Sequence, residues 1–583
     1  MTETVPSNLT SRLSKLNPFA KAKGDEEDLG ETIDSTSVAG GGHAARRTKL
    51  TSKELRVGRA LRSFLVQKNV LSAADADVET DQQTPALQAL LDKSHLDVPS
   101  YVTDRSHPLP EYFISSSHNT YLTAHQLYGS STATAYETAL LNGARCVEID
   151  AWDDDDNPDE PKVTHGYTLT SNLPFRAVCQ TIKEVVDREA AQPTSAEGHA
   201  APIMLSLENH CGAHGQLRLA QIMQEVWGDR LLSKSVRDHG HQEQAGTGNH
   251  VTLKELGNKI AVMVEYHFAG EPEDSDTSSD EEEDEKTKAE QKAYKESKKK
   301  AAASPIIPEL AELGVYAQSV KPVDQSWLTG DLKNGPHHHL INMSESGVSK
   351  LLPASTAAIS QHNAHHLMRV YPKGTRIFSR NLNACTYWGV GAQVAALNWQ
   401  TFDASMQLNE ALFSGSDGYV LKPAALRAGG NGRLSTGRKK RLRLHIGGAT
   451  HVPTPEDYDA AEMKPYVTCT LIHPDNVDDK PPKSKTSAYK QHKLSFLHKG
   501  ENPPVTEPIW DEALEWVYEE NELVFLRILI KSDDAWARNP MFAVAAVRLS
   551  YVAQGWVFIR MLDLKGRETH CSLLVKFEFE DVA

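Results

Sequence analysis

Short apolar runs alternate with amphipathic stretches between residues 107 and 268. YFISS, ARCVEID, PIMLSLEN and NKIAVMVEY have the length and composition of strands, whereas LRLAQIMQEVW has helical spacing. This alternation is typical of a parallel sheet or barrel. Strand-like runs resume at HHLINM, TRIFS, QVAALNWQ and GYVLKP. We therefore predict two halves of one α/β fold, at 107–268 and 306–427.

A charged segment separates these halves. Residues 271–285 hold ten acidic positions, and residues 286–300 hold seven lysines. Such a composition stays solvated rather than packed, so residues 269–305 are predicted to be a disordered linker. The linker either shields the functional site from anionic membranes by repulsion or acts as an inert tether.

The two ends of the chain have different patterns. Residues 438–583 contain short alternating runs such as RLRLHIG and LVFLRILI, which predict an all-β sandwich. Residues 1–50 are rich in Gly, Ser, Thr and charge, and are predicted to be disordered. Thr51 and Glu54 resemble a capping box, so residues 51–106 are predicted to be a helical spacer or an EF-hand remnant.

Composition and net charge restrict the classes of function that the chain can have. The chain has 583 residues, 39% of them hydrophobic, which suits several soluble domains. The 62 basic and 78 acidic residues give a net charge of −16, which disfavours nucleic-acid binding. The six cysteines form no CxxC pair, and the polar N-terminus lacks a secretory core. We therefore expect a cytoplasmic protein without zinc knuckles or disulfides.

Acidic side chains gather at the ends of predicted strands. The two-residue period of a strand places Glu148 and Asp150 on one face, which would point into the core of a parallel sheet. Unpaired carboxylates are costly there unless a cation or hydrogen bonds compensate. Glu208 ends a further apolar run, and Asn119 follows another. Such a hard-oxygen set suits calcium or magnesium.

Histidines accompany this acidic set. His118 and His165 lie near predicted strand ends, where parallel-barrel enzymes carry their chemistry. The oxygen set leaves them available for proton transfer. The runs HHH at 337–339 and HNAHH at 362–366 have no cysteine or acid cluster beside them, so we interpret them as non-metal histidines.

Several motifs resemble one enzyme family. ISSSHNTYL, LLNGARCVEIDAWD, THGYTLTS and LSLENHC resemble the first catalytic half of eukaryotic phosphoinositide-specific phospholipase C. RVYPKGTR, GAQVAALNWQT and GYVLKPAALR resemble its second half. The last 145 residues or so are similar, less sharply, to its C2 lipid-binding sandwich. The resemblance is to delta-like or fungal-like members without a PH domain, and implies a split TIM (β/α)8-type barrel followed by a C2-type sandwich.

The resemblance also implies a reaction in signal transduction. In this family the inositol 2-hydroxyl attacks the 1-phosphodiester in a calcium-dependent step, which releases diacylglycerol and a cyclic phosphate that water then opens. The matching calcium ligands are Asn119, Glu148, Asp150 and Glu208, with Glu148 or Glu208 as the base. His118 matches the donor to the phosphoryl oxygen, and His165 the general acid. Arg369, Tyr371 and Asn342 match headgroup-binding positions.

The sequence departs from the family at the headgroup. Met263 and Glu265 stand where two phosphate-binding lysines are usual, Asn342 replaces a serine, and SRNL at 379–382 replaces SSNY. Because a carboxylate repels phosphate, we expect phosphatidylinositol or a monophosphate to be handled comparatively better than the bisphosphate.

The C2-type segment also departs from the calcium-binding version of that domain. Lys464 lies where a calcium-binding loop would offer an aspartate, which leaves Asp533 and Asp534, so we expect calcium-independent docking to membranes. The basic run Arg438, Lys439, Lys440 and Arg441 either meets anionic lipid or is a solvated linker.

Two other functions stay open. One is a catalytically silent, membrane-recruited scaffold of the same fold, which Met263 and Glu265 favour. The other is a glycerophosphodiester phosphodiesterase, also a metal-dependent barrel enzyme, which the split barrel and the sandwich disfavour.

Overall fold

The fold is described from a computed structural model of the chain. It describes residues 51–582 except for 81, 124–129, 132, 165–172, 192–200, 238–250, 268–304, 330–331, 333–334, 374–380, 455–461, 476–479, 493–501 and 534–540. The predicted disordered N-terminus, nearly all of the charged linker and the TRIFS run therefore lie outside the described residues.

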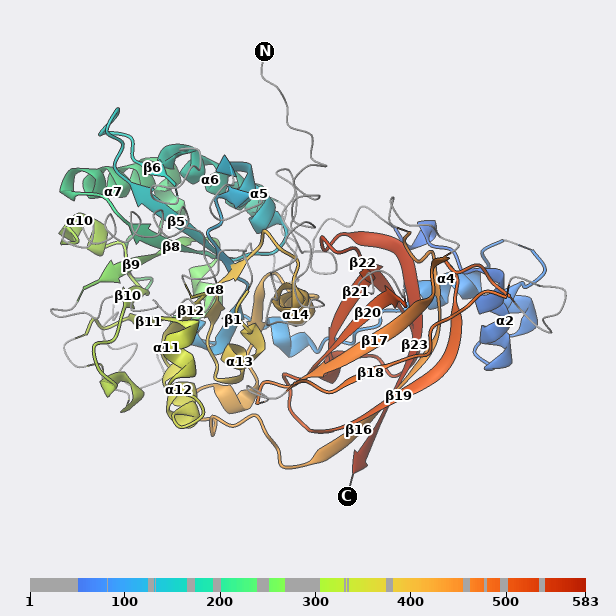
Figure 1. The fold of residues 1–583 in the computed structure, drawn as a ribbon. Coiled ribbons are helices and arrows are strands. Elements are labelled where there is room, and N and C mark those ends of the chain that lie inside the picture. Colours follow the sequence, from blue (N-terminus) through green and yellow to red (C-terminus); the bar gives the residue numbers. More distant parts are fainter. Residues whose placement is uncertain are drawn as a thin grey trace, which may run out of the picture.

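Eight parallel strands form a closed barrel (Figure 1). The first half contributes β1 (Tyr112–Ile114), β5 (Cys146–Trp152), β8 (Ile203–Asn209) and β9 (Ile260–Tyr266). The second half contributes β10 (Gln318–Val320), β11 (His339–Ser344), β12 (Leu367–Tyr371) and β13 (Val394–Ala395). Neighbouring strands pair in parallel, and a parallel bridge between Ser116 and Cys146 closes the ring. The predicted split barrel is confirmed.

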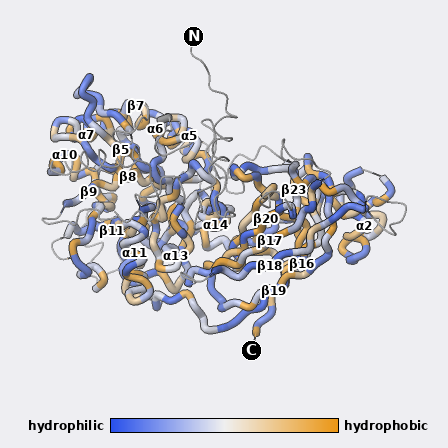
Figure 2. The backbone as a smooth tube through the Cα atoms, in the orientation of Figure 1, coloured by the Kyte–Doolittle hydropathy of each residue, from blue (hydrophilic) through white to orange (hydrophobic). Residues whose placement is uncertain are grey.

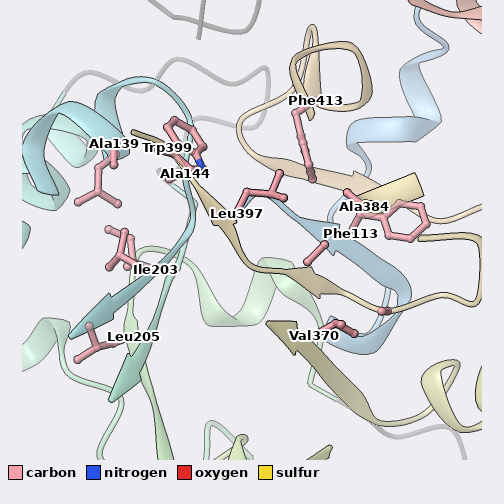
Figure 3. Packing of buried hydrophobic residues seen from close by; sticks show 14 of the residues in the cluster. Phe113, Ala139, Ala144, Ile203, Leu205, Val370, Ala384, Leu397, Trp399 and Phe413 are labelled. Carbon is pink, nitrogen blue, oxygen red and sulfur yellow. The ribbon is translucent and has the colours of Figure 1, made fainter. Parts of the chain in front are cut away.

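Helices cover the outside of this barrel. They include α5 (Ala133–Leu141), α6 (Phe175–Ala191), α7 (Ala213–Trp227), α11 (Glu345–Ser349), α12 (Thr356–Asn363), α13 (Ala384–Gly389) and α14 (Ala404–Phe413). Val147 and Ile149 of β5 belong to the large core that includes helix residues, part of which is drawn in Figure 3. Cys146 belongs to a separate core with Met263. The alternation in ARCVEID therefore points its even-numbered side chains into the barrel, as predicted.

The C-terminal domain is an eight-stranded antiparallel β-sandwich, which confirms the predicted C2-type architecture. It contains β16 (Lys439–Thr450), β17 (Pro465–Ile472), β18 (Lys483–Lys485), β19 (Ile509–Glu519), β20 (Phe525–Ser532), β21 (Met541–Arg548), β22 (Gly555–Leu562) and β23 (Glu568–Val582). Strands β20 and β21 pack against α14 of the barrel. At this contact, Arg527 Nε donates a 2.6 Å hydrogen bond to Gln407 Oε1.

The N-terminal helices pack on the sandwich. Helices α2 (Arg59–Gln67) and α4 (Pro85–Asp92) lie beside it, away from the barrel (Figure 1). Leu61 and Phe64 share a buried cluster with Phe558 and Leu574. The capping box of Thr51 and Glu54 is present, but it begins a 3-10 turn rather than an α-helix. The segment is therefore tied to the sandwich through an apolar contact.

Hydrophobic positions are interspersed with hydrophilic ones in both domains (Figure 2). Within the described ranges, no helix combines the length and apolar character that crossing a membrane requires. All six cysteines are buried and none forms a disulfide, in agreement with the sequence prediction.

Candidate active site

Two predicted metal ligands meet at the carboxyl ends of neighbouring strands. β5 and β8 pair in parallel with Asp150 opposite Glu208. One carboxylate oxygen of each lies within 4.8 Å of the other and of a His210 ring nitrogen. The Asp150 residue is 2% exposed. Two carboxylates held this close repel each other unless a cation or donors lie between them, so this pair fits a hard divalent cation such as Ca²⁺.

Side chains around this pair fix its position. The Tyr121 hydroxyl donates a 2.6 Å hydrogen bond to Asp150 Oδ2, and lies 3.3 Å from Asn119 Oδ1. His210 Nε2 lies 3.4 Å from Glu208 Oε1, and its ring stacks on Trp152 at 4.1 Å. Asn119 is therefore joined to the acidic pair through Tyr121. The sequence reasoning assigned no role to Tyr121 or His210, although His210 directly follows the LSLEN strand.

Glu148 is held differently from the other predicted ligands. Its Oε1 accepts a 2.6 Å hydrogen bond from Arg369 Nη2, and its Oε2 accepts one of 2.8 Å from the Asn119 backbone N–H. Asn119 makes this contact from a left-handed backbone conformation, with φ of 46°. The guanidinium of Arg369 thus neutralises Glu148 beside the carboxylate pair.

Arg369 connects the acidic site to the predicted headgroup positions. Its Nη1 donates a 3.1 Å hydrogen bond to Asn342 Oδ1, and its guanidinium lies 5.5 Å from the centre of the Tyr371 ring. Burial lowers the pKa of Arg369, but nearby negative groups, Glu148 first, bring it above its ordinary value. The three predicted headgroup residues are therefore neighbours around one permanently charged donor.

His118 faces Oε2 of Glu148, the carboxylate oxygen that Arg369 does not bind. β2 (Ser117–His118) pairs in parallel with β14 (Leu397–Asn398), which brings His118 Nδ1 within 2.8 Å of Asn398 Oδ1. Because an amide oxygen only accepts, Nδ1 carries the proton and Nε2 faces Glu148 Oε2 at 3.9 Å. Burial lowers the pKa of His118, although Glu148 acts in the opposite direction. Sequence reasoning missed Asn398, whose only signal was a polar residue at the end of an apolar run.

Asn398 is expected to act as a positioning residue. Replacing it in Asn398→Ala removes the acceptor that fixes the His118 tautomer, so kcat of a reaction in which His118 takes part should fall about tenfold to a hundredfold. KM should change little, because Asn398 lies behind the imidazole. Asn398→Asp keeps an acceptor oxygen and should restore most of kcat. Equal losses of kcat in both variants would contradict this role.

Met263 and Glu265, which stand where two phosphate-binding lysines are usual in the family, both lie on β9. Met263 is buried in the interior core, opposite Ser206 on β8. Two residues further along the strands, Glu265 and Glu208 reach the same end of the barrel. Burial raises the pKa of Glu265, and the charge of Glu208 raises it further. Both effects disfavour the charged form of Glu265, so this position offers the site a carboxyl group and no positive charge.

The remaining residues singled out in the sequence lie either outside the described residues or in the sandwich. His165, Ser379, Arg380 and Asp534 lie outside the described residues. The Lys464 carbonyl accepts a 3.0 Å hydrogen bond from the Asp533 N–H, so these two positions are neighbours in the sandwich.

The basic run on β16 faces acidic partners. Arg438 and Lys440 pair with Glu520 at 2.5 and 2.6 Å, and Arg441 pairs with Glu580 at 3.3 Å. These glutamates reduce the positive charge that the run offers to anionic lipid.

Comparison with known proteins agrees with this architecture. The model of the phosphatidylinositol-specific phospholipase C X domain matches residues 105–266, and the model of the Y domain matches residues 310–425. The chain is 30% identical to 1-phosphatidylinositol 4,5-bisphosphate phosphodiesterase 1 of Candida albicans, covering 82% of this chain and 48% of that protein. It is 31% identical to 1-phosphatidylinositol 4,5-bisphosphate phosphodiesterase of Dictyostelium discoideum, covering 82% and 60%.

A solved structure extends the match to the sandwich. The fold is similar to that of L. pealei PLC21, with a TM-score of 0.67 and 24% identity, covering 99% of this chain and 69% of that one. Of the two curated relatives above, the chain spans about half to three fifths of the length. Both halves of its barrel carry the defining domains, and the chain belongs to the phosphatidylinositol-specific phospholipase C family of phosphodiesterases.

Proposed function

We propose that this chain is a calcium-dependent phospholipase C that cleaves phosphatidylinositol or its phosphates into diacylglycerol and inositol phosphates. The observation that carries the proposal is the convergence of Asp150 and Glu208 beside Glu148, His118 and Arg369 at one end of the barrel. The residues suit Ca²⁺, with Asn119, Glu148, Asp150 and Glu208 as its ligands. Bound there, the ion would lower the pKa of the inositol 2-hydroxyl and neutralise charge on the phosphate.

Among the residues, Glu208 is the more available base for the 2-hydroxyl proton. Both oxygens of Glu148 already accept hydrogen bonds, one of them from cationic Arg369. The Glu208 side chain is 25% exposed and lies against His210. A carboxylate that does not have to leave a buried guanidinium accepts a proton more readily.

His118 is positioned to assist at the phosphoryl oxygen. Its Nε2 points to the site while Nδ1 donates to Asn398, so Nε2 donates only when the ring is protonated. The negative phosphodiester favours that protonated form, in opposition to burial. As the attacking oxygen bonds to phosphorus and the glyceride oxygen leaves, His165 would protonate the leaving oxygen and then activate water to open the cyclic phosphate.

Membrane contact is proposed for the sandwich. Its C2-type architecture suits peripheral recruitment from the cytoplasm, and Lys464 beside Asp533 favours a mode that does not need calcium. The glutamate partners of Arg438, Lys440 and Arg441 argue that other surfaces contribute as well.

The expected headgroup preference follows from the absence of a cationic side chain at Met263 and Glu265. The two relatives compared above are named for the 4,5-bisphosphate, whereas this site carries Glu265 and Met263. We expect Glu265→Lys to raise the rate on the bisphosphate relative to phosphatidylinositol about tenfold, which corresponds to ~1.4 kcal/mol. Initial rates on vesicles of each lipid measure this ratio. Glu265→Gln should give an intermediate value, and a strong bisphosphate preference of the unmodified chain would reject the idea.

One assay separates this function from its alternatives. Phosphatidylinositol vesicles and Ca²⁺ are incubated with the chain, and water-soluble products are identified. The proposed enzyme releases inositol phosphates and leaves diacylglycerol in the vesicle. A silent scaffold would bind vesicles and release nothing, and a glycerophosphodiester phosphodiesterase would act only on the deacylated lipid.

A further inference from the structure

Three histidines meet at the end of the barrel opposite the candidate active site. His339 is the first residue of β11, His362 lies in the last turn of α12, and His366 directly precedes β12. One ring nitrogen of each lies within 4.8 Å of the other two. Asn342 follows His339 by three residues along β11, about 10 Å at the rise of a strand. The His339–His362–His366 trio is therefore separate from the calcium site.

The distance between two of the rings is close to that of a metal centre, since His339 Nε2 and His362 Nε2 are 3.0 Å apart. The partly exposed His366 ring stacks on that of His339 at 4.0 Å with the two planes 16° apart. An imidazole binds a metal ion in its own ring plane, so His366 has to turn about its side-chain bonds to share an ion with His339. Two nitrogens bound to tetrahedral zinc at about 2.0–2.1 Å lie about 3.3 Å apart. A movement of about 0.3 Å would thus give the His339–His362 pair the spacing of zinc ligands.

Hydrogen bonds fix the tautomer of His362. The Asn363 amide nitrogen donates a 2.9 Å hydrogen bond to the Val390 carbonyl, so its Oδ1 faces His362 Nδ1 at 2.9 Å. An amide oxygen only accepts, so Nδ1 of His362 carries the hydrogen. The Nε2 of a neutral His362 therefore points a lone pair at His339.

His339 points its Nε2 toward this lone pair, at 3.0 Å. In the His339 tautomer that is protonated at Nδ1, a second lone pair faces that of His362, and a cation bound by both nitrogens satisfies the two lone pairs.

We propose that His339, His362 and His366 bind one transition-metal ion of the Zn²⁺ type, with water as the fourth ligand. Imidazole suits zinc, and His362, which pairs through Nδ1 with the Asn363 amide oxygen, is oriented as zinc ligands usually are. His366 is partly exposed and gives the ion access to solvent. Bound zinc links β11 to the segment between α12 and β12 and takes part in no chemical step. This replaces the non-metal interpretation of the two histidine runs.

The test uses the full-length chain, freed of metal, at pH 7.5. Competition of Zn²⁺ against a chromophoric chelator measures stoichiometry and affinity, and Co²⁺ reports geometry through its visible spectrum. We expect one strong zinc site, four-coordinate Co²⁺ bands and a higher Tm with zinc. His366→Gln and His362→Gln should weaken zinc binding at least tenfold, whereas the neighbouring control His365→Gln should not. Asp150→Asn should keep the zinc site, because it lies in the other centre.

The unmodified chain decides the matter even if a variant fails to fold. Failure to take up stoichiometric zinc would overturn the proposal and leave a proton shared between His339 and His362. Equal zinc binding by His366→Gln, or loss of the site in Asp150→Asn, would also overturn it.

Discussion

His118→Ala is expected to lower inositol phosphate release from phosphatidylinositol vesicles about 100-fold to 10,000-fold, the range typical of a positioned acid–base group. The imidazole lies at the edge of the site with Nε2 3.9 Å from Glu148, held from behind by Asn398. Alanine removes the ring and leaves the strand pair Leu397–Ser117 in place. Initial rates at saturating calcium, together with thermal unfolding, separate lost chemistry from lost folding.

A matched control uses a histidine of the same barrel. The His214 side chain on α7 is 61% exposed and pairs with Asp159, away from the acidic pair. His214→Ala should keep the activity of the unmodified chain. Full activity of folded His118→Ala would remove His118 from the reaction.

Asp150→Asn and Glu208→Gln should each raise the calcium concentration needed for half-maximal activity by on the order of a hundredfold. Each substitution keeps the shape of the side chain and removes one negative charge from a pair whose oxygens lie within 4.8 Å. Activity at low calcium should therefore be lost and should recover in part as calcium rises. Initial rates as a function of free calcium measure the shift.

The control for charge alone is Asp159→Asn. The Asp159 side chain is 71% exposed on the surface and should leave the calcium midpoint unchanged. An unchanged midpoint in both Asp150→Asn and Glu208→Gln would show that calcium acts elsewhere.

The sequence could predict those parts of the site that local periodicity determines. The alternation in ARCVEID placed Glu148 and Asp150 on the inner face of β5, because side chains alternate along any strand. Once β5 and β8 pair in parallel, Asp150 and Glu208 are neighbours by register. The fold class followed from the alternation of strand and helix patterns in both halves.

The remaining contacts depend on tertiary pairing that periodicity does not encode. The His118–Asn398 contact joins residues 280 apart, and the Glu148–Arg369 contact joins residues 221 apart. No local pattern distinguishes Asn398 from any polar residue that ends an apolar run. The histidine runs illustrate the same limit, since His339 and His362 meet only because the end of α12 reaches the start of β11 in the folded chain.

The central claim is that calcium held by the barrel carboxylates supports cleavage through the inositol 2-hydroxyl. Phosphorus NMR of phosphatidylinositol vesicles treated with the chain, with calcium or with excess chelator, tests it most directly. We predict a five-membered cyclic inositol phosphate that appears first and only with calcium, followed by its slow opening. Equal product formation in chelator, or an acyclic phosphate with no cyclic precursor, would contradict the account.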